Sequence, residues 1–404
     1  MLEFSYTARD RASNKQVHST VKAESEKSAA KLLMDQGLMP LKITEASSDD
    51  AFLAGLRNRV TTKDRIVFSR QLATLINAGL PLAQSLHTVR DQTTNKKLQS
   101  VAQDIISSIE GGSTLSNAFA KHPKIFNDVF IALVSAGEAS GTLDKALERI
   151  ADQQEKDAAI MSKVKGAMMY PVIVGFVMVG VIIFMLVTVV PQVGRLYHDL
   201  HQELPLLTKL MVGAADFIQK FWWLVIAATG AGIYFLRNWL QTDSGRSVAD
   251  SFKLNVPMFG PLFRKLYMAR FARTAETLMT TGVPMLETLN ITKRAVNNVH
   301  IAAVIGRASD KVKGGKSLSS SLKDEDYVLP LVPQMISIGE QSGGIDAMLN
   351  KAATFYENEL DETIKSISTM IEPILMVALA GVAGVMIGAV LFPIYALVGN
   401  GAIR

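Results

Sequence analysis

The residues that most resemble a catalytic loop form a glycine-rich pattern containing a glutamate and a serine, and the pattern occurs twice. Extended to Asp144 and Asp346, the two copies agree at five of eight positions. The first four shared residues of each copy are Gly137, Glu138, Ser140 and Gly141, and Gly339, Glu340, Ser342 and Gly343. Such a serine could act as a nucleophile if a base lay beside it. No Ser-His-Asp arrangement recurs in both halves, so a turn between two helices is favoured over catalysis.

The two repeated glutamates, Glu138 and Glu340, each follow an apolar helical stretch and precede a Ser-Gly turn. One interpretation is that the carboxylate caps the next helix by accepting backbone N–H bonds. The other is a direct contact with a moving partner protein. The two interpretations are compatible, because a rigid turn is a suitable docking surface.

Lys313-Gly314-Gly315-Lys316-Ser317 resembles the end of a phosphate-binding loop. The first glycine of that loop would fall on Asp310, no strand precedes it, and the first copy has Gly111-Gly112-Ser113-Thr114 without a lysine. We therefore interpret both stretches as helix–helix turns, in which glycine relieves backbone strain and Ser or Thr caps the following helix.

Metal-binding chemistry has two weak candidates. His198, His201 and Glu203 lie in a short predicted loop that lacks further ligands in fixed geometry. Glu155 and Glu357 recur in both halves on charged helix faces, which favours a solvated surface or a partner-facing acidic patch and leaves a structural cation open. The sequence thus predicts no enzyme: no catalytic residue, cofactor or metal site is assigned.

The composition indicates a membrane protein. The chain has 404 residues, 49% of them hydrophobic, and a mean hydropathy of +0.22. Without cysteine, disulfides and thiolate metal sites are excluded. The formal charge of +5 is too diffuse for nucleic-acid binding. No signal peptide is visible, so the N-terminus is expected in the cytoplasm.

The chain in order predicts a mainly α protein with a small N-terminal αβ module. Alternation from Phe4 to Ala8, a helical run over 25–36 and a short strand over 38–43 make up this module, 1–46. A polar linker occupies 47–60. A first cytoplasmic helical bundle of five or six helices follows over 61–169, with the sequence from Thr61 to Asp64 as its first cap.

Three transmembrane helices are expected. The first, 170–193, contains nineteen uncharged residues from Val172 to Val190, enough to cross the hydrocarbon layer. An extracytoplasmic loop, 194–220, leads to the second span, 221–237, which carries Trp222 and Trp223 as interfacial anchors. A second cytoplasmic bundle, 238–372, precedes the third span, 373–398, and an extracytoplasmic tail, 399–404. In the third span the GxxxG spacing of Gly384 and Gly388 permits close helix packing.

The two bundles are copies of one another. Register holds over more than 120 residues, at an offset of 203 and, after one indel, of 202. The paired turn and span-start residues are Gly79 with Gly282, Pro81 with Pro284, Gly111 and Gly112 with Gly314 and Gly315, and Pro171 with Pro373. Each half is therefore a bundle that runs into a span. Lys and Arg are sparse over 194–220 and cluster on the opposite side, which favours an N-in, C-out topology.

These motifs resemble the type II secretion F-protein family. The match rests on Phe68-x3-Leu72-x6-Gly79-x-Pro81-Leu82, on Gly111-Gly112-x2-Leu115, on Gly137-Glu138-x-Ser140-Gly141 and on Tyr170-Pro171, all echoed in a second copy. The second copy departs from the first in having Glu372-Pro373 in place of Tyr170-Pro171. The match covers residues 61–398, and the N-terminal region also looks like the family's leader.

The resemblance implies a non-enzymatic platform protein of the bacterial inner membrane, in a type IV pilus or type II secretion machine. The implied partners are a hexameric cytoplasmic ATPase, pilins or pseudopilins, other inner-membrane assembly proteins, the lipid bilayer, and further copies of the chain. The alternative is a transporter subunit with duplicated halves, although three spans without a central charge are few for a pore. A membrane enzyme is the weakest alternative. Pilus extension, pilus retraction and secretion stay open.

Overall fold

The computed structural model describes residues 2–10, 16–23, 25–35, 38–45, 59–199 and 206–399. The predicted linker core at 47–58 and the tail at 400–404 lie outside these ranges. The chain divides into two compact units, residues 1–72 with 80–112, and residues 73–79 with 113–404.

The N-terminal module is a three-stranded antiparallel sheet with one helix. Strands β1 (Leu2–Asp10), β2 (Gln16–Ala23) and β3 (Leu38–Glu45) have the order β2-β1-β3, and α1 (Glu26–Asp35) precedes β3. In the register, Phe4 lies opposite Val21 on one side and Glu45 on the other. The predicted strand around Phe4 is the central strand β1, and the predicted strand over 38–43 is the edge strand β3; the other edge strand, β2, was not predicted.

The first copy of the repeat is built from six helices. They are α3 (Thr62–Asn77), α4 (Leu82–Gln92), α5 (Lys96–Glu110), α6 (Leu115–Ala120), α7 (Asp128–Ser140) and α8 (Leu143–Phe184). Helix α3 begins with a reciprocal cap, because Thr61 N–H donates to Asp64 Oδ2 at 2.9 Å and Asp64 N–H donates to Thr61 Oγ1 at 3.2 Å. These hydrogen bonds hold the pKa of the Asp64 carboxyl below its usual value.

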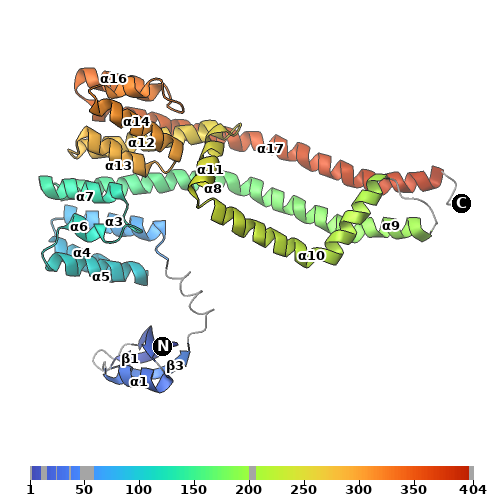
Figure 1. The fold of residues 1–404 in the computed structure, drawn as a ribbon, viewed down its shortest axis with the longest axis horizontal. Coiled ribbons are helices and arrows are strands. Elements are labelled where there is room, and N and C mark those ends of the chain that lie inside the picture. The colour runs from blue at the N-terminus through green and yellow to red at the C-terminus, as the bar shows by residue number, and fades with distance from the viewer. Residues whose placement is uncertain are drawn as a thin grey trace. The chain divides into compact units, whose positions relative to one another are not determined.

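The second copy repeats the same helices in the same order (Figure 1). Its members are α12 (Gly260–Thr280), α13 (Met285–Ala295), α14 (Val299–Lys313), α15 (Leu318–Leu322), α16 (Leu331–Ser342) and α17 (Ile345–Gly399). The prediction of a mainly α, tandemly repeated chain is thereby confirmed. Helix α11 (Asp243–Asn255) lies between the copies and was not predicted.

Glycines with positive φ mark equivalent turns in the two copies. Their φ values are +83° and +89° at Gly79 and Gly282, +86° and +87° at Gly112 and Gly315, and +71° and +75° at Gly141 and Gly343. A residue with a Cβ rarely adopts this left-handed conformation, so glycine ends the helices here at the lowest conformational cost. The backbone of the turns is therefore repeated as closely as the sequence.

The second copy has a continuous apolar core in which α12 packs along α17. Small residues such as Ala272 and Ala353 let the two helices approach, while larger side chains fill the space between them. Fully or almost fully buried members of this core are Leu266, Phe271, Leu289, Val304, Ile336, Leu349, Tyr356 and Leu360. Residues Ile160 and Val164 of α8 also pack against it, so the first copy's last helix contributes to the second copy's core.

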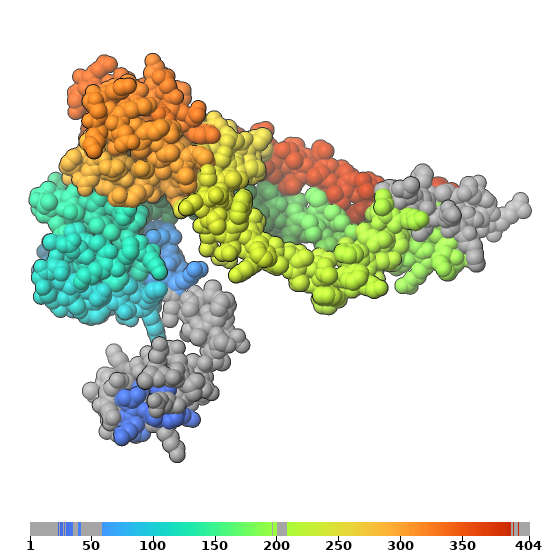
Figure 2. All heavy atoms as spheres, in the orientation of Figure 1, coloured from blue at the N-terminus to red at the C-terminus, as the bar shows by residue number. Residues whose placement is uncertain are grey.

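Three helices in the described residues are long and apolar enough to cross a membrane: Leu143–Asp199, Thr208–Trp239 and Ile345–Gly388. Their side chains face outward, with Phe176 81% and Val377 73% exposed, as expected for surfaces that contact lipid. Pro171 and Pro373, the predicted span starts, lie inside continuous helices instead of at helix boundaries. Each bundle therefore passes into its span through one continuous helix, α8 or α17 (Figure 1). Figure 2 draws the atoms of the same helices, green for α8 and red for α17.

Within the predicted loop 194–220 the described residues, 194–199 and 206–220, are helical. After α8 a π-helical turn, Met185–Val189, leads into α9 (Val190–Asp199), and α10 (Leu206–Trp239) starts well before the predicted span. Helix α10 is kinked at Phe221, where the backbone leaves helical geometry. Gln219 donates from its side-chain amide to the carbonyl of Val187 at 2.8 Å, which satisfies a carbonyl in the π-helical turn.

Candidate functional site

Glu138 holds the start of the short helix α6. Its carboxylate accepts hydrogen bonds from the backbone N–H of Leu115, from the N–H of Ser116 at 2.9 Å and from the Ser116 hydroxyl at 2.5 Å. Thr114, the N-cap, accepts from Asn117 N–H at 3.3 Å. The first three N–H groups of α6 are therefore all satisfied, and a negative charge lies at the positive end of the helix.

Glu340 repeats this arrangement in the second copy. Its carboxylate accepts from Leu318 N–H at 2.6 Å, from Ser319 N–H at 3.3 Å and from the Ser319 hydroxyl. Ser317 takes the N-cap position and accepts from Ser320 N–H at 3.3 Å. Both glutamates thus bind the first turn of a helix that precedes them in the chain by more than twenty residues. The expectation that they cap the next helix is wrong.

The neighbouring glycines let two helices touch. A Cβ on Gly137 would lie 2.6 Å from Cβ of Ala146, and one on Gly339 would lie 2.6 Å from Cα of Ile345. Real Cβ atoms do not approach so closely, so only glycine fits where α7 meets α8 and α16 meets α17. Their sequence pattern indicates a turn, whereas their role in helix packing depends on contacts that only the folded chain makes.

The repeated serines do not have a nucleophile's surroundings. Ser140 donates to the carbonyl of Ala136 at 2.7 Å, and Ser342 donates to that of Ile338 at 2.8 Å. These are hydrogen bonds of a helical serine to its own preceding turn. The turn residues next to them are exposed, whereas Glu138 and Glu340 are half-buried. Each turn is therefore held from the inside by the hydrogen bonds of its glutamate, while the residues beside the serine are open to solvent.

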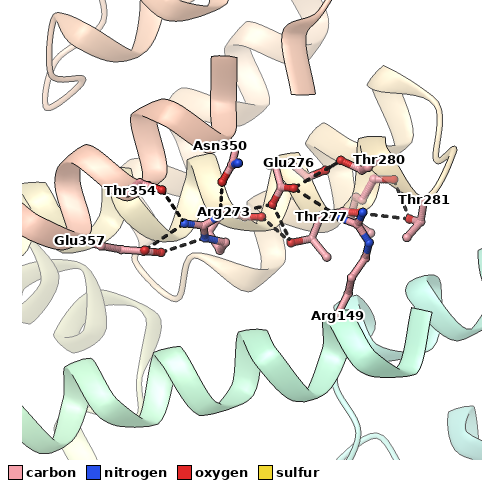
Figure 3. Close-up of polar contacts among 10 residues, drawn as sticks. Arg149, Arg273, Glu276, Thr277, Thr280, Thr281, Asn350, Thr354 and Glu357 are labelled. Atoms are coloured by element: carbon pink, nitrogen blue, oxygen red, sulfur yellow. Dashed lines mark hydrogen bonds and ion pairs between the residues drawn. The ribbon is translucent and has the colours of Figure 1, made fainter. Parts of the chain in front are cut away.

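A charged network links α12 to α17, centred on Arg273 (Figure 3). Arg273 Nε donates to Glu357 Oε1 at 2.8 Å and Nη2 donates to Oε2 at 2.9 Å, a side-on bidentate pair. Further bonds run to Asn350 at 2.6 Å and Thr354 at 3.2 Å. Desolvation opposes the charge of Arg273, but the bonds with Glu357 and the attraction of Glu357 and Glu276 outweigh it and raise the pKa of Arg273.

This network corrects the interpretation of Glu357. Its side chain is only 19% exposed and its cation is the guanidinium of Arg273, which is itself 11% exposed. A solvated acidic face therefore does not describe it. Glu155, the equivalent residue in the first copy, is exposed. The sequence offered one signal that was missed: Arg273 and Glu276 are opposite charges three residues apart in one helical stretch, a spacing that places them on the same helix face.

Polar contacts also connect the last helices of the first copy with the second copy. Arg149 on α8 pairs with Glu276 on α12 at 3.5 Å, the contact that Figure 3 shows beside the Arg273 network. Elsewhere Lys163 on α8 pairs with Asp361 on α17 at 2.6 Å, and Arg294 on α13 pairs with Asp128 on α7 at 2.6 Å. The second copy is thus tied to α7 and α8 by ion pairs, besides the apolar contacts of Ile160 and Val164.

The remaining candidates fall into two groups. His198 lies in α9, whereas His201 and Glu203 lie outside the described residues; within the described ranges no three His, Asp or Glu side chains gather as a metal cluster. Gly384 and Gly388 lie in α17, and a Cβ at either position would meet nothing within 4 Å among the described residues. Their spacing therefore serves no packing role inside the described part of this chain.

Comparison with known proteins gives one consistent family. Residues 68–191 and 271–393 match the family described as type II secretion system (T2SS), protein F, and residues 1–44 match its N-terminal domain. The chain is 37% identical over 402 residues, 98% of both chains, to the type IV pilus assembly protein PilC of Thermus thermophilus. It is 32% identical over 366 residues, 90% of this chain and 97% of the relative, to PilC of Pseudomonas aeruginosa.

A second group of relatives has a different name. The type II secretion system protein F of Pseudomonas aeruginosa is 32% identical over 401 residues, which are 98% of this chain and 99% of that relative. The two family matches of residues 68–191 and 271–393 coincide with the two structural copies, α3–α8 and α12–α17. From its duplicated helical bundles, its apolar helices and these matches, the chain belongs to the type II secretion system protein F family.

Proposed function

We propose that this protein is the inner-membrane platform of a type IV pilus or type II secretion machine, where a cytoplasmic hexameric ATPase drives pilins or pseudopilins into a growing fibre. The names of the relatives, pilus assembly protein and secretion system protein, support the platform role. The finer steps, contact with the ATPase and insertion of pilins, are part of the proposal.

One structural observation carries the coupling step. Helix α17 has 55 residues and passes from the second bundle to the end of its apolar stretch without interruption, and α8 runs from the first copy into its apolar stretch as far as Phe184, where a π-helical turn follows. At about 1.5 Å per residue such a helix spans roughly 80 Å. A continuous helix transmits a displacement of the bundle to the membrane segment, which a flexible linker would absorb.

The proposal also includes the topology and the assembly. The bundles at 61–169 and 238–372 face the cytoplasm, the N-terminus lies inside and the C-terminus outside. The exposed turns beside Ser140 and Ser342 are docking positions for the assembly partners, and Gly384 and Gly388 are positions where a second copy of the chain can approach closely. No catalytic residue is assigned, because the energy source is the ATPase.

The test breaks the helical connection while keeping both ends. A Gly-Gly-Ser insertion between Lys165 and Gly166 interrupts α8 just before the span. We expect membrane insertion and ATPase co-purification to persist and fibres or secretion to be lost. The same insertion within the linker 47–58 is the matched control and should leave assembly intact. Normal fibre assembly with the interrupted α8, or ATP hydrolysis by the purified chain alone, would contradict the proposal.

A further inference from the structure

An apolar groove lies where the four helices α8, α11, α12 and α17 come together. The groove has a volume of about 250 Å³ and is lined by Val164 and Met168 of α8, Phe252 and Val256 of α11, Phe263 of α12 and Ile367 of α17. Its walls are apolar, and Lys253 is the one charged residue among the described residues that line it. An open apolar groove on a protein surface needs an occupant to keep it from water.

The distance between the groove and the membrane follows from the positions of its residues in the sequence. Met168 precedes Val172, where the uncharged run begins, by four residues, and Ile367 precedes Ile374 by seven. At about 1.5 Å per residue these residues lie roughly 6 to 10 Å from the hydrocarbon layer, at or just above the level of the lipid headgroups. Helix α11 starts four residues after Trp239, where α10 ends. The groove therefore opens beside the bilayer surface.

The apolar surface of the groove continues onto the membrane-facing helices. Met168, Met169 and Tyr170 are 40%, 58% and 55% exposed, and the exposed run extends into the span. On α11 Phe252 is 70% exposed, so an aromatic ring stands at the rim of the groove. An occupant coming from the membrane can pass from one apolar surface to the other without crossing water.

Charge selects among lipids. Lys253 lies at the groove with its Nζ 2.8 Å from Asp250, whose side chain is 3% exposed, while the Lys253 side chain is 43% exposed. Lys165 and Lys365, each next in sequence to a residue of the groove, are exposed and form no ion pair within the described residues. Basic side chains at headgroup level attract anionic lipids.

We propose that this groove binds an acyl chain of an anionic phospholipid whose headgroup lies beside Lys253. Among the described residues helix α11 has no counterpart before α3, so the groove combines α8 of the first copy with elements found only beside the second copy. The bound lipid fills the junction of α8, α11 and α17 and anchors the bundle to the membrane surface. This role goes beyond the proposed platform function and does not depend on it.

The test uses phosphatidylglycerol carrying a photoreactive diazirine at the end of one acyl chain. The purified full chain is reconstituted into vesicles of phosphatidylethanolamine and phosphatidylglycerol containing this probe, irradiated, digested and mapped by mass spectrometry. We expect lipid adducts on peptides containing Phe252, Val256 and Phe263, in addition to the spans. Adducts confined to the spans would overturn the proposal.

Two sets of variants make the map specific. Ala167→Trp fills the groove and should abolish the adducts there, whereas Ala228→Trp on the exposed face of α10 should leave them unchanged. Lys253→Gln should reduce the preference for phosphatidylglycerol over an identical phosphatidylcholine probe by about fivefold, and Lys253→Arg should keep it. If Ala167→Trp fails to fold by gel filtration, the Lys253 pair and the wild-type map decide. An unchanged lipid preference in Lys253→Gln would contradict the assigned headgroup position.

The lipid experiment uses the purified chain without the ATPase and without fibres. Its outcome therefore does not depend on the outcome of the platform test.

Discussion

Arg273 and Glu357 form a side-on bidentate ion pair, with two hydrogen bonds of 2.8 and 2.9 Å, that joins α12 to α17. Because both side chains are mostly buried, removal of one leaves the other charge without its partner in a poorly solvated place. The pair therefore makes the contact between the first and last helices of the second copy depend on specific residues as well as on apolar burial.

Substitution of one partner of this pair should lower the free energy of unfolding more than substitution of both partners. We expect Arg273→Met to destabilise the protein by about 3 kcal/mol, and Arg273→Met with Glu357→Leu to restore part of the loss. Thermal unfolding in detergent micelles measures both. Arg273→Lys tests geometry, since an ammonium cannot reproduce the bidentate bonds. Additive losses in the double variant would show that the two residues do not interact energetically.

Glu340→Ala should loosen the start of α15 by about 1 to 2 kcal/mol, because the N–H groups of Leu318 and Ser319 lose their acceptor. Hydrogen exchange at these two amides should speed up by about tenfold or more, while Glu340→Gln should show a smaller change because its amide oxygen still accepts. Glu138→Ala should do the same at Leu115 and Ser116. The variant with both Glu138→Ala and Glu340→Ala tests the two roles together. If its melting temperature, ATPase binding and fibre assembly all equal those of the wild type, the glutamates have neither the structural role nor the docking role.

Gly339→Ala should be strongly destabilising, because its Cβ would lie 2.6 Å from the backbone Cα of Ile345, which cannot move alone. A loss of about 1 to 3 kcal/mol is expected from this overpacking. Gly166→Ala is the matched control: it lies in α8 with nothing within 4 Å of the added carbon, and should stabilise the helix by up to about 1 kcal/mol. Equal melting temperatures for the two variants would rule out the close approach of α16 and α17.

Glu325 should make stability depend on pH in the acid range. Arg307 Nε donates a hydrogen bond to the Glu325 carboxylate at 3.0 Å, and Lys311 donates another. These bonds lower the pKa of the Glu325 carboxyl below its usual value of 4.5. A carboxyl with a lowered folded-state pKa contributes stability that is complete above its unfolded pKa and is lost as pH falls through the folded value.

Arg307→Gln should therefore lower the free energy of unfolding by about 1 kcal/mol at neutral pH, and the difference from wild type should shrink below pH 4.5. Melting temperatures across this range measure it. Arg294→Gln, which removes the more exposed pair with Asp128, is the control and should have almost no effect. A difference that stays constant down to strongly acid pH would mean that Glu325 is not the responsible group.

The absence of cysteine allows a clean test of topology. Single cysteines placed in exposed positions can be probed with a membrane-impermeant maleimide without any background from the native chain. We expect Ser140→Cys and Ser342→Cys to react only after the inner membrane is opened, and His198→Cys to react in intact spheroplasts. Labelling of Ser140→Cys from outside would reverse the proposed orientation.

Much of the fold was readable from the sequence because local signals repeat at a fixed spacing. Gly79, Gly112 and Gly141 have counterparts one repeat later, and a positive φ at such positions is a property of the turn itself, which local residues specify. The uncharged run after Val172 is long enough to identify a span by composition alone. Strand β2 and helix α11 were missed because polar residues dominate both, so composition alone does not distinguish them from connecting segments.

The sequence by itself determined the duplication, the membrane class, the helical character of both copies and the turns that separate their helices, since all of these depend on composition and on neighbours within a few residues. Only the tertiary structure decided which helix Glu138 and Glu340 bind, that Glu357 pairs with Arg273, and that Gly137 and Gly339 serve helix contact. These relationships join residues that are distant in the chain, and one side chain has many partners of suitable chemistry until packing brings a particular one within hydrogen-bonding distance. The repeated Gly-Glu-x-Ser-Gly pattern thus predicted a turn. The hydrogen bonds from α6 and α15 to its glutamates depend on how the helices of the bundle pack.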